Sequence, residues 1–305
     1  MRYMVTGAAG FIGSHLAEAL VAQSHEVVGV DCFTDYYDVA MKEENARGFD
    51  VQRIDLADED LDLQGVDGIF HLAAQPGVRS FGDVFDVYVR QNLVASRRVF
   101  EAAARAGVRV VFSSSSSVYG EAESYPTAEE TVPRPISPYG ITKHGSEQLA
   151  RAYALSFGLD IVVLRYSTFY GPRQRPDMAF ARIVDALARG VPFELYGDGL
   201  QSRAFTYVTD GVDATLTAMD RAPAGALYNV GGGAEATMRD AIAMLEGIAG
   251  HTLELIERPA AKGDVRRTAP DTSLIERELG WRATTALEDG LSAQWEWAVS
   301  RVAAG

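Results

Sequence analysis

Three side chains that can move a proton lie between residues 115 and 143 of the chain. Tyr139 and Lys143 are four residues apart, so on a helix they share one face. An ammonium group beside a phenol stabilises the phenolate and lowers the pKa of the tyrosine from its usual value of about 10. Ser115 can bring a hydroxyl from a nearby strand end to share a substrate hydroxyl with that phenol. This combination predicts removal of a proton from an alcohol while its hydride leaves for a nicotinamide.

The Tyr–Lys spacing alone does not establish a site. Lysine occurs in this chain at Lys42, Lys143 and Lys262, beside 13 tyrosines. Chance gives roughly 0.1 pairs at this spacing, so a surface tyrosine one turn from a surface lysine is the alternative. The other motifs have to decide between the two.

The sequence around these residues predicts alternating strands and helices. Short apolar segments predict strands at 3–6, 26–30, 50–54, 68–72, 108–112 and 159–165. Apolar residues at helical spacing predict helices at 12–22, about 83–106 and about 137–156. Ser137 and Pro138 suit the start of the last helix. Repeated strand–helix units imply a parallel sheet covered by helices on both faces.

A glycine-rich turn joins the first predicted strand to the first helix. Gly7, Gly10 and Gly13 permit a tight turn, the approach of the backbone to a pyrophosphate, and the packing of helix on strand. Phe11 and Ile12 begin the helix, whose free N–H groups and dipole favour phosphates. A glycine-rich turn is common, but between a strand and a helix it predicts a dinucleotide site.

Asp31 ends the second predicted strand. Its carboxylate can accept hydrogen bonds from both adenosine ribose hydroxyls and would repel a 2′-phosphate. The adjacent residues 32–34 include no arginine to bind such a phosphate. The cofactor is therefore predicted to be NAD and not NADP.

Other residues are expected at the cofactor because of their places along the predicted sheet. Asn92, midway along a predicted helix, needs a polar partner, which is either the cofactor or a second helix. The remaining candidates are Asp55 and Leu56 beside the adenine and Leu72, Ala73 and Ala74 beneath the pyrophosphate, together with Ser113, Tyr166, Tyr139 and Lys143.

Composition excludes several classes of function. With a formal charge of −14, the chain lacks the excess of Lys and Arg that nucleic-acid phosphates require. Cys32 is the only cysteine, which excludes an internal disulfide and fits a reducing cytoplasm. No signal-like segment opens the sequence and no apolar run approaches ~18 residues, so a cytoplasmic protein without a membrane partner is expected. No metal site is predicted.

The strand–helix rhythm loosens after about residue 166. Segments rich in Gly and Pro at 171–176, 197–199 and 231–233 separate shorter elements. We predict an NAD-binding domain over 1–165, with segments returning to its sheet at about 204–232. Residues 166–305 are predicted to form a smaller, discontinuous substrate-binding region. A chain of 305 residues is long enough for two such units that share a cleft.

Several motifs occur in an order that resembles the extended short-chain dehydrogenase/reductases, and more narrowly their nucleotide-sugar epimerases. They are the glycine-rich turn, the segment 71–74, the serine run that leads to Val118-Tyr119-Gly120, and the Tyr139–Lys143 pair. The resemblance covers essentially the whole chain. It implies an α/β fold, with a Rossmann-type doubly wound parallel sheet that binds NAD and a smaller, discontinuous α/β C-terminal region. It also implies a UDP-sugar in the cleft and a homodimer through the helices at about 83–106 and 137–156.

The resemblance also implies roles for individual residues. Tyr139 would be the base, Lys143 its pKa partner, and Ser115 the hydroxyl that completes the proton relay. Relatives that dehydrate carry an acidic pair directly after the catalytic hydroxyl, and relatives that decarboxylate uronic acids carry Glu two residues before the tyrosine of Val-Tyr-Gly. This chain has Ser116 and Ser117 there. The remaining path is oxidation at C4, rotation of the keto sugar and return of the hydride to its other face, which is 4-epimerisation.

The segments 31–37, 75–79 and 170–178 most resemble bacterial UDP-glucuronate 4-epimerases. A glucuronate carboxylate needs a charged donor, and arginine offers a planar fork of N–H groups. Arg175 is the first candidate and Arg79 the second, with the sugar-nucleotide diphosphate as the competing partner of both. The other expected substrate contacts are the hydroxyls of Ser115, Ser116, Ser117 and Thr168, Arg203 and Arg266 at the diphosphate, and Pro76 and Asp264.

A uronic acid adds a chemical constraint to this reaction. Oxidation at C4 gives a β-keto acid, which loses carbon dioxide when the C5–carboxylate bond aligns with the carbonyl π system. An epimerase must therefore hold the carboxylate away from that alignment with several fixed donors. Arg175 and the hydroxyls of Ser116, Ser117 and Thr168 are the predicted set.

Alternatives remain open at this point. UDP-glucose 4-epimerase shares the core motifs, while a decarboxylase or dehydratase is disfavoured by the two serines named above. A non-catalytic NAD-binding protein on the same fold is the alternative from another class, and the intact Ser–Tyr–Lys trio argues against it. Ala204 and Ser167 stand where many relatives carry Asp and Phe, at the phosphate loop and near the nicotinamide respectively.

Overall fold

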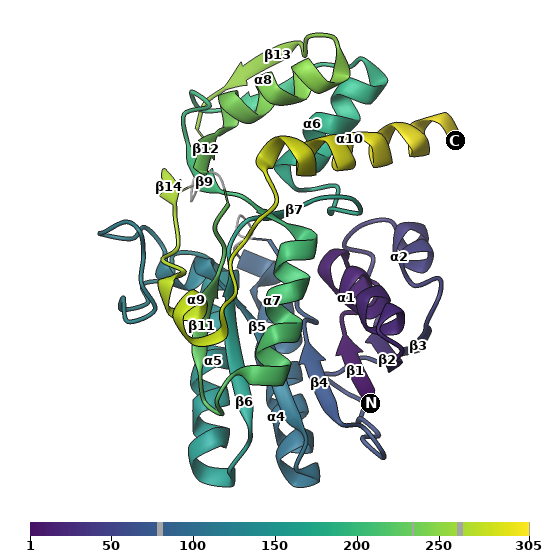
Figure 1. The fold of residues 1–305 in the computed structure, drawn as a ribbon, viewed down its shortest axis with the longest axis vertical. Coiled ribbons are helices and arrows are strands. Elements are labelled where there is room, and N and C mark those ends of the chain that lie inside the picture. The colour runs from purple at the N-terminus through teal and green to yellow at the C-terminus, as the bar shows by residue number, and fades with distance from the viewer. Residues whose placement is uncertain (78–81, 234, 261–264, 305) are drawn as a thin grey trace.

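A seven-stranded parallel sheet forms the centre of the larger part of the molecule (Figure 1). The computed structural model describes residues 1–77, 82–233, 235–260 and 265–304. Neighbouring strands follow the order β11-β6-β5-β4-β1-β2-β3. Their bounds are β1 (Arg2–Thr6), β2 (Glu26–Asp31), β3 (Asp50–Arg53), β4 (Gly68–His71), β5 (Arg109–Ser115), β6 (Ile161–Tyr166) and β11 (Leu227–Val230). The predicted doubly wound α/β fold is confirmed. From β1 the chain builds outward to β3 and then returns to β4 on the other side, so a ligand-binding switch point lies at the carboxyl ends of β1 and β4.

Helices cover both faces of this sheet because side chains alternate along each strand. One face packs on α1 (Phe11–Ala22), α7 (Val208–Arg221) and α9 (Ser273–Leu279). The other packs on α4 (Ala95–Ala106) and α5 (Pro138–Phe157). In β5, Val111 belongs to the first core, and Val110 and Phe112 belong to the second. The alternation therefore fixes which residues at the strand ends can point into a shared site.

The predicted helix over 83–106 is a composite of different helical geometries. It comprises a 3₁₀ turn η1 (Gly82–Val84), α3 (Phe85–Tyr88), a π-helical segment η2 (Val89–Val94) and α4. Asn92 lies in the π-helical segment, and its backbone oxygen accepts a hydrogen bond of 3.0 Å from the Ser146 hydroxyl of α5. Such π-helical turns occur often near functional sites, where they redirect a side chain.

Two elements near the site differ from the prediction: one strand is longer, and one helix was not predicted. Strand β5 runs on to Ser115 and passes directly into a 3₁₀ turn, η3 (Ser116–Tyr119), so the serine run is ordered structure that ends the strand. Helix α2 (Val39–Asn45) was not predicted. It has seven residues, too few for an apolar periodicity to stand out, and Asp38 caps it by accepting from Ala40 N at 2.9 Å.

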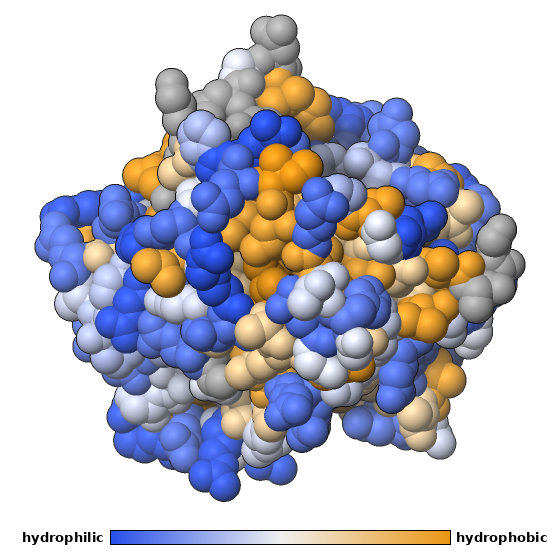
Figure 2. All heavy atoms as spheres, turned by 90° about the horizontal axis from the view of Figure 1, so that it is seen from above, coloured by the Kyte–Doolittle hydropathy of each residue, from blue (hydrophilic) through white to orange (hydrophobic). Residues whose placement is uncertain are grey.

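The smaller region has its own core beyond the carboxyl edge of the sheet. Its helices are α6 (Ala179–Arg189), α8 (Met238–Ala249) and α10 (Leu287–Ala304). Its strands are β7 (Phe169–Tyr170) with β10 (Thr206–Tyr207), β8 (Phe193–Tyr196) with β13 (Leu255–Arg258), and β12 (Glu235–Thr237), β9 (Ser202–Ala204) and β14 (Arg267–Thr268) together. Seen from this end, apolar side chains gather near the centre of the surface among hydrophilic ones (Figure 2). No helix within the described residues is long and apolar enough to cross a membrane.

Candidate active site

Two cavities lie at the carboxyl edge of the large sheet, and both are lined by Ser115, Tyr166 and Thr168. The first has a volume of about 270 Å³ and the second about 240 Å³. The first is lined by the glycine-rich turn, Asp31, the 72–76 segment, Ser113, Tyr139 and Arg175. The second is lined by Ser116, Ser117, Tyr119, Tyr125, Arg203, Arg267 and Pro270. A ligand in one cavity would therefore meet a ligand in the other at Ser115.

The glycine-rich turn is shaped by close backbone contacts. A Cβ at Gly13 would stand 2.1 Å from the Gly7 oxygen, and one at Gly7 would stand 2.8 Å from Ala73 N. Gly7 also has a φ of +71°, which favours glycine. Gly10, Phe11 and Ile12 line the cavity beside them. The turn thus leaves its backbone and the start of α1 open to a ligand, which fits the pyrophosphate of a dinucleotide.

The Asp31 carboxylate is oriented by two backbone N–H groups. Oδ2 accepts from Ala9 N at 3.1 Å and Oδ1 accepts from Phe33 N at 2.8 Å. Burial raises the pKa of Asp31, while these bonds and the nearby Lys42 charge oppose that rise. Asp31 lines the first cavity, where its predicted contact with a ribose would have to be made.

Lys42 is a cavity residue that sequence reasoning missed. It is buried on α2, and its Nζ donates to the Thr34 oxygen at 2.7 Å and to Thr34 Oγ1 at 3.0 Å. The preference for NAD was argued from residues 32–34 alone, whereas this cation comes from eight residues farther along. The sequence feature that could have drawn attention to Lys42 is that the chain has three lysines.

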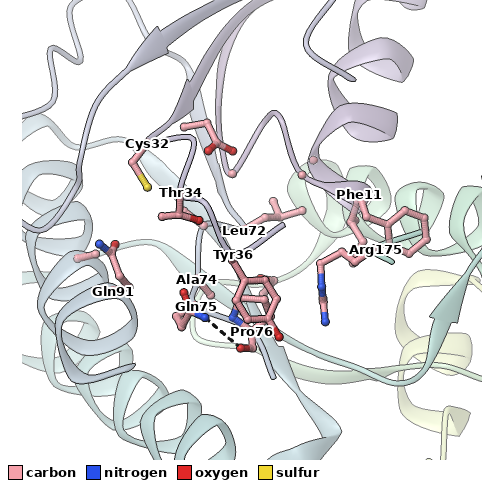
Figure 3. A pocket seen from close by; sticks show the side chains of 18 of the residues that line it. Phe11, Cys32, Thr34, Tyr36, Leu72, Ala74, Gln75, Pro76, Gln91 and Arg175 are labelled. Carbon is pink, nitrogen blue, oxygen red and sulfur yellow. Dashed lines mark hydrogen bonds between the residues drawn. The ribbon is translucent and has the colours of Figure 1, made fainter. Parts of the chain in front are cut away.

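The other side of the first cavity is formed by residues from separate elements. Leu72, Ala73 and Ala74, which were predicted to contact the cofactor, line it, and so does Pro76, which was predicted to contact the substrate. Figure 3 shows Arg175 on the side of Phe11, and Tyr36 toward Gln75 and Pro76. Gln75, Gln91, Tyr36 and Tyr37 also line this cavity and were not singled out from the sequence.

The proton-transfer trio is brought together by β5 and α5. Ser137 caps α5 by accepting from Gly140 N at 3.1 Å, with Pro138 in the first turn, as predicted. Tyr139 and Lys143 then follow on one face of α5. Ser115, at the end of β5, lines the first cavity together with Tyr139, and its hydroxyl donates to Ser117 Oγ at 3.1 Å. Lys143 Nζ lies 5.9 Å from the centroid of the Tyr139 ring.

The expectation that Lys143 lowers the pKa of Tyr139 below its usual value is wrong. Burial raises the pKa of Tyr139, and the groups that oppose the rise are Arg175 and Ser115. Burial also lowers the pKa of Lys143 to about 7. Lys143 Nζ donates to the Ser113 backbone oxygen at 2.7 Å, so its ammonium is directed at a carbonyl and not at the phenol. Both groups are too deeply buried for spacing alone to set their pKa values.

Asn92 and Asp55 are tied to protein groups and do not line either cavity. Asn92 Oδ1 accepts from Gln75 N at 2.7 Å, and Asn92 Nδ2 donates to Thr142 Oγ1 at 2.9 Å. Asp55 accepts from Arg90 Nη1 at 2.8 Å and from Ala57 N at 3.0 Å. For Asn92 the structure therefore favours the alternative of a tie between helices. The adjacent Leu56 does line the first cavity.

Arg175 lies in the first cavity with Tyr139, and it already has a carboxylate partner. Its Nε and Nη2 donate to Asp177 Oδ1 and Oδ2, each at 3.0 Å. The Tyr36 hydroxyl donates to the same Asp177 Oδ2 at 3.2 Å. Thr168, with a φ of +40°, lines this first cavity as well as the second.

Arginines of the second cavity differ in part from those predicted. Arg203 lines it, and its Nη2 donates to the Val265 oxygen at 2.7 Å. Arg266 does not line it but pairs with Asp198 at 3.0 Å. Arg267, the first residue of β14, lines the cavity instead, and its guanidinium donates to the Glu235 carboxylate at 2.7 Å and 2.8 Å.

The remaining predicted positions are placed as follows. Ser116 and Ser117 line the second cavity, and Ser115 Oγ accepts from Ser117 N at 3.1 Å. Ala204 is buried in β9, and Ser167 is buried with a hydroxyl that has no partner among the described residues. Arg79 and Asp264 lie outside the residues that the structure describes.

Comparison with known proteins places this site in a family. The model of the NAD dependent epimerase/dehydratase family matches residues 3–231. The uncharacterized UDP-glucose epimerase YtcB of Bacillus subtilis is 41% identical, with 96% of each chain covered. The UDP-glucuronate 4-epimerase of Thermodesulfobacterium geofontis is 33% identical, with 98% of this chain and 97% of the relative covered.

A solved structure agrees over nearly the whole chain. The crystal structure of UDP-glucuronic acid 4-epimerase from Bacillus cereus in complex with UDP-glucuronic acid and NAD has a TM-score of 0.95 and 38% identity, covering 99% of this chain and 100% of the other. The resemblance to nucleotide-sugar epimerases and the prediction of NAD as cofactor are confirmed. With its glycine-rich turn, its Ser–Tyr–Lys trio and a match that runs from the first strand to the last strand of the large sheet, this chain belongs to the NAD dependent epimerase/dehydratase family.

Proposed function

We propose that this protein epimerises a UDP-sugar at C4, with UDP-glucuronate as the preferred substrate and UDP-galacturonate as the product. The observation that carries the proposal is the meeting of the two cavities at Ser115, directly beside Tyr139. A cofactor in the first cavity and a sugar nucleotide in the second would bring their reacting ends to these hydroxyl groups. Neither Ser116 nor Ser117 supplies a carboxyl group for elimination or decarboxylation.

In this mechanism, the residues of the chain transfer one proton and orient the sugar. NAD, when bound, accepts a hydride from C4 and returns it. The Tyr139 phenolate takes the proton of the C4 hydroxyl, and the Ser115 hydroxyl shares that hydrogen bond. After the keto sugar has turned its other face toward the cofactor, Tyr139 returns the proton to the C4 oxygen. A proton on Lys143, whose Nζ lies 5.9 Å from the centroid of the Tyr139 ring, would stabilise the phenolate as it forms, although burial has the larger effect on the pKa of Tyr139.

The residues around Tyr139 support a carboxylated sugar. Arg175 is the cation that acts on the phenol, so its guanidinium lies within electrostatic reach of the sugar. Together with the hydroxyls of Ser116, Ser117 and Thr168, it would fix the carboxylate out of line with the C4 carbonyl and prevent loss of carbon dioxide. The name of YtcB favours UDP-glucose as the second candidate substrate.

The central test is incubation with UDP-glucuronate or UDP-glucose, without added NAD, followed by analysis of the products. We expect UDP-galacturonate from the first sugar, with no net change in cofactor. Faster turnover of UDP-glucose would replace the uronate with the neutral sugar, and a pentose or 6-deoxy-4-keto product would overturn epimerisation.

The Arg175→Ala variant tests the uronate assignment. We expect kcat/KM for epimerisation of UDP-glucuronate to fall about 10- to 100-fold and a pentose product to appear, with KM and UDP-glucose turnover changed less. Arg173→Ala is the matched control, because Arg173 is two residues away but pairs with Glu18 of α1 at 2.6 Å. Unchanged uronate turnover in Arg175→Ala would remove this residue from the site.

We also propose that two copies associate through the helices at about 83–106 and 137–156. Exposed apolar side chains support this, namely Phe85, Val87, Ile141, Leu155 and Phe157. Analytical ultracentrifugation should give a dimer for the wild type and a smaller species when Leu155 and Phe157 are both replaced by Lys. A wild-type monomer at micromolar concentration would refute the assembly.

A further inference from the structure

A buried ion pair lies directly beneath the catalytic trio and takes no part in the mechanism above. Glu147 of α5 pairs with Arg165 of β6 through two hydrogen bonds, Nε to Oε1 at 2.9 Å and Nη2 to Oε2 at 2.8 Å. Glu147 is 5% exposed and Arg165 is 4% exposed. Burying two charges is costly even when they are paired, so such a pair is weak evidence of a role in stability alone.

Glu147 extends a regular series of contacts along α5. Tyr139, Lys143 and Glu147 follow one another at four-residue intervals, so they share one face of the helix. They bind three consecutive residues at the end of β5. Tyr139 contacts the Ser115 hydroxyl and Lys143 donates to the Ser113 oxygen at 2.7 Å. Glu147 Oε1 accepts from the Ser114 hydroxyl at 2.6 Å.

The far side of the ion pair reaches the second cavity. Arg165 Nη1 donates to the Tyr119 hydroxyl at 2.8 Å, and Tyr119 donates to Asn229 Oδ1 at 2.8 Å. Tyr119 lines the second cavity. Asn229 Nδ2 donates to the oxygens of Thr127 at 2.9 Å and Asp271 at 3.0 Å, and so fixes two segments that flank that cavity.

We propose that Glu147 is a positioning residue for the epimerisation proposed above, which keeps Lys143 cationic and holds the Ser113–Ser115 segment in register with the second cavity through Arg165 and Tyr119. This inference rests on the proposed function. It assigns the helix face three successive tasks: Tyr139 meets the sugar, Lys143 supplies the charge, and Glu147 maintains that charge and its place.

The groups around Lys143 support the electrostatic part of this role. Tyr139 and Glu147 face it from α5, and His71 on β4 experiences its charge. The Phe112 ring of β5 lies 4.9 Å from Nζ. Burial lowers the pKa of Lys143 to about 7, and the charge of Glu147 is the influence that opposes this. Removing that charge should lower the pKa of Lys143 further, so that less of it is protonated at neutral pH.

Two other side chains lie against Glu147. Arg165 neutralises part of its charge, and His144 Nδ1 lies 3.5 Å from Oε2. The pair with Arg165 therefore fixes where the carboxylate stands, while the remaining field reaches Lys143 one turn away. A Glu147→Gln change keeps the shape of the side chain but removes this field.

The first experiment compares the pH dependence of kcat for the NAD-loaded wild type and Glu147→Gln. We expect the alkaline loss of kcat to move about one pH unit lower and kcat at pH 8 to fall about tenfold, with KM changed less than about threefold. Asp160→Asn is the matched control, because Asp160 pairs with Arg109 at 2.8 Å at the opposite end of the same two strands. Its pH profile should be that of the wild type.

A second measurement reads Lys143 directly and needs no sugar. The chain has three lysines, so a carbon-13 label on lysine gives few signals, and Lys143→Met assigns the relevant one. In Glu147→Gln its titration should move to lower pH. A folded Glu147→Gln protein with the wild-type Lys143 titration would overturn the proposal. A wild type that epimerises no sugar, with the Lys143 shift present, would overturn the proposed function instead.

Two milder variants keep the test decisive if Glu147→Gln fails to fold. Ser114→Ala removes one bond to Glu147 without stranding Arg165 and keeps every charge, so we expect kcat to fall several-fold with the Lys143 titration close to that of the wild type. Tyr119→Phe breaks the link to the second cavity and keeps every charge, so we expect kcat to fall several-fold with the pH profile unchanged. An unaltered kcat in both variants would contradict the inference.

Discussion

The two cavities that meet at Ser115 are built in different ways. The first is bounded on one side by backbone at the ends of β1, β2 and β4, where glycines and N–H groups set the shape, and on the other by side chains such as Tyr139 and Arg175. The second is formed by side chains from segments far apart in the sequence, among them Tyr119, Arg203 and Arg267. A cavity made of backbone changes little among relatives of one fold, whereas one made of side chains can be altered residue by residue. We therefore expect cofactor choice to depend on the first cavity, and sugar choice to depend on the second together with Arg175, which lines the first.

The largest effect is expected where the cavities join. Tyr139→Phe should lower kcat by about 10²- to 10⁴-fold, because the phenol is the proposed proton carrier. NAD and the sugar nucleotide should still bind, since the ring remains. Steady-state kinetics combined with calorimetric binding of the UDP-sugar would check both statements. A loss of kcat of less than about tenfold would mean that another group carries the proton.

The backbone of the first cavity should not tolerate a single methyl group. Gly13→Ala would place a Cβ 2.1 Å from the Gly7 oxygen, so we expect lost NAD and about 1–3 kcal/mol less free energy of unfolding. Gly247→Ala in α8 is the control, because nothing lies within 4 Å of its Cβ, and it should raise stability by up to about 1 kcal/mol. Absorbance of bound NAD and urea unfolding would measure the pair. Retained NAD in Gly13→Ala would show that the turn adapts.

The second cavity should respond to one of two adjacent arginines. Arg267→Met should weaken UDP-sugar binding about tenfold, or about 1.4 kcal/mol, and leave the NAD content unchanged. Arg266→Met should leave both unchanged, since Arg266 pairs with Asp198 outside the cavity. Titration calorimetry with UDP would separate them, and equal effects of the two variants would reverse this assignment.

A buried histidine of β4 and a half-buried histidine of α1 should make stability fall in acid. Burial lowers the pKa of His71 to about 3 and that of His15 to about 4, from a usual value of 6.5. The unfolded chain therefore binds more protons, and the free energy of unfolding should fall as pH decreases from about 6.5 toward 3. Urea unfolding at several pH values should show a flatter decline for His71→Asn than for the wild type. The exposed His251→Gln variant should keep the wild-type decline. If the free energy of unfolding declines as steeply in His71→Asn, groups other than His71 cause the loss of stability in acid.

The contrast between the cavities also explains what could be predicted from the sequence. The glycine turn, Asp31 and the Tyr139–Lys143 spacing are local patterns whose geometry follows from one strand end or one helix turn. Arg266 was predicted at the second cavity, whereas Arg267 lines it. Which of two adjacent arginines faces a cavity depends on the pairing of β14 with β9, and that pairing cannot be read from local sequence. Lys42 was missed because a seven-residue helix carries too little periodicity.

The electrostatic expectation failed for a related reason. Spacing placed an ammonium near a phenol, as observed, but a pKa depends on burial and on every charge nearby. Burial raises the pKa of Tyr139, and the groups that counter it include Arg175, which is 36 residues away in sequence. Such a sum is a property of the folded site and cannot be read from a single motif.

The Arg175–Asp177 pair limits how strongly this site can discriminate between acidic and neutral sugars. For Arg175 to bind a sugar carboxylate with both arms of its guanidinium, it has to leave a carboxylate that already occupies both. The binding step is then an exchange of one ion pair for a similar one, and only the difference between them adds to affinity. Selection for uronates would then act mainly on the geometry of the bound carboxylate during the reaction, and less on which sugar enters.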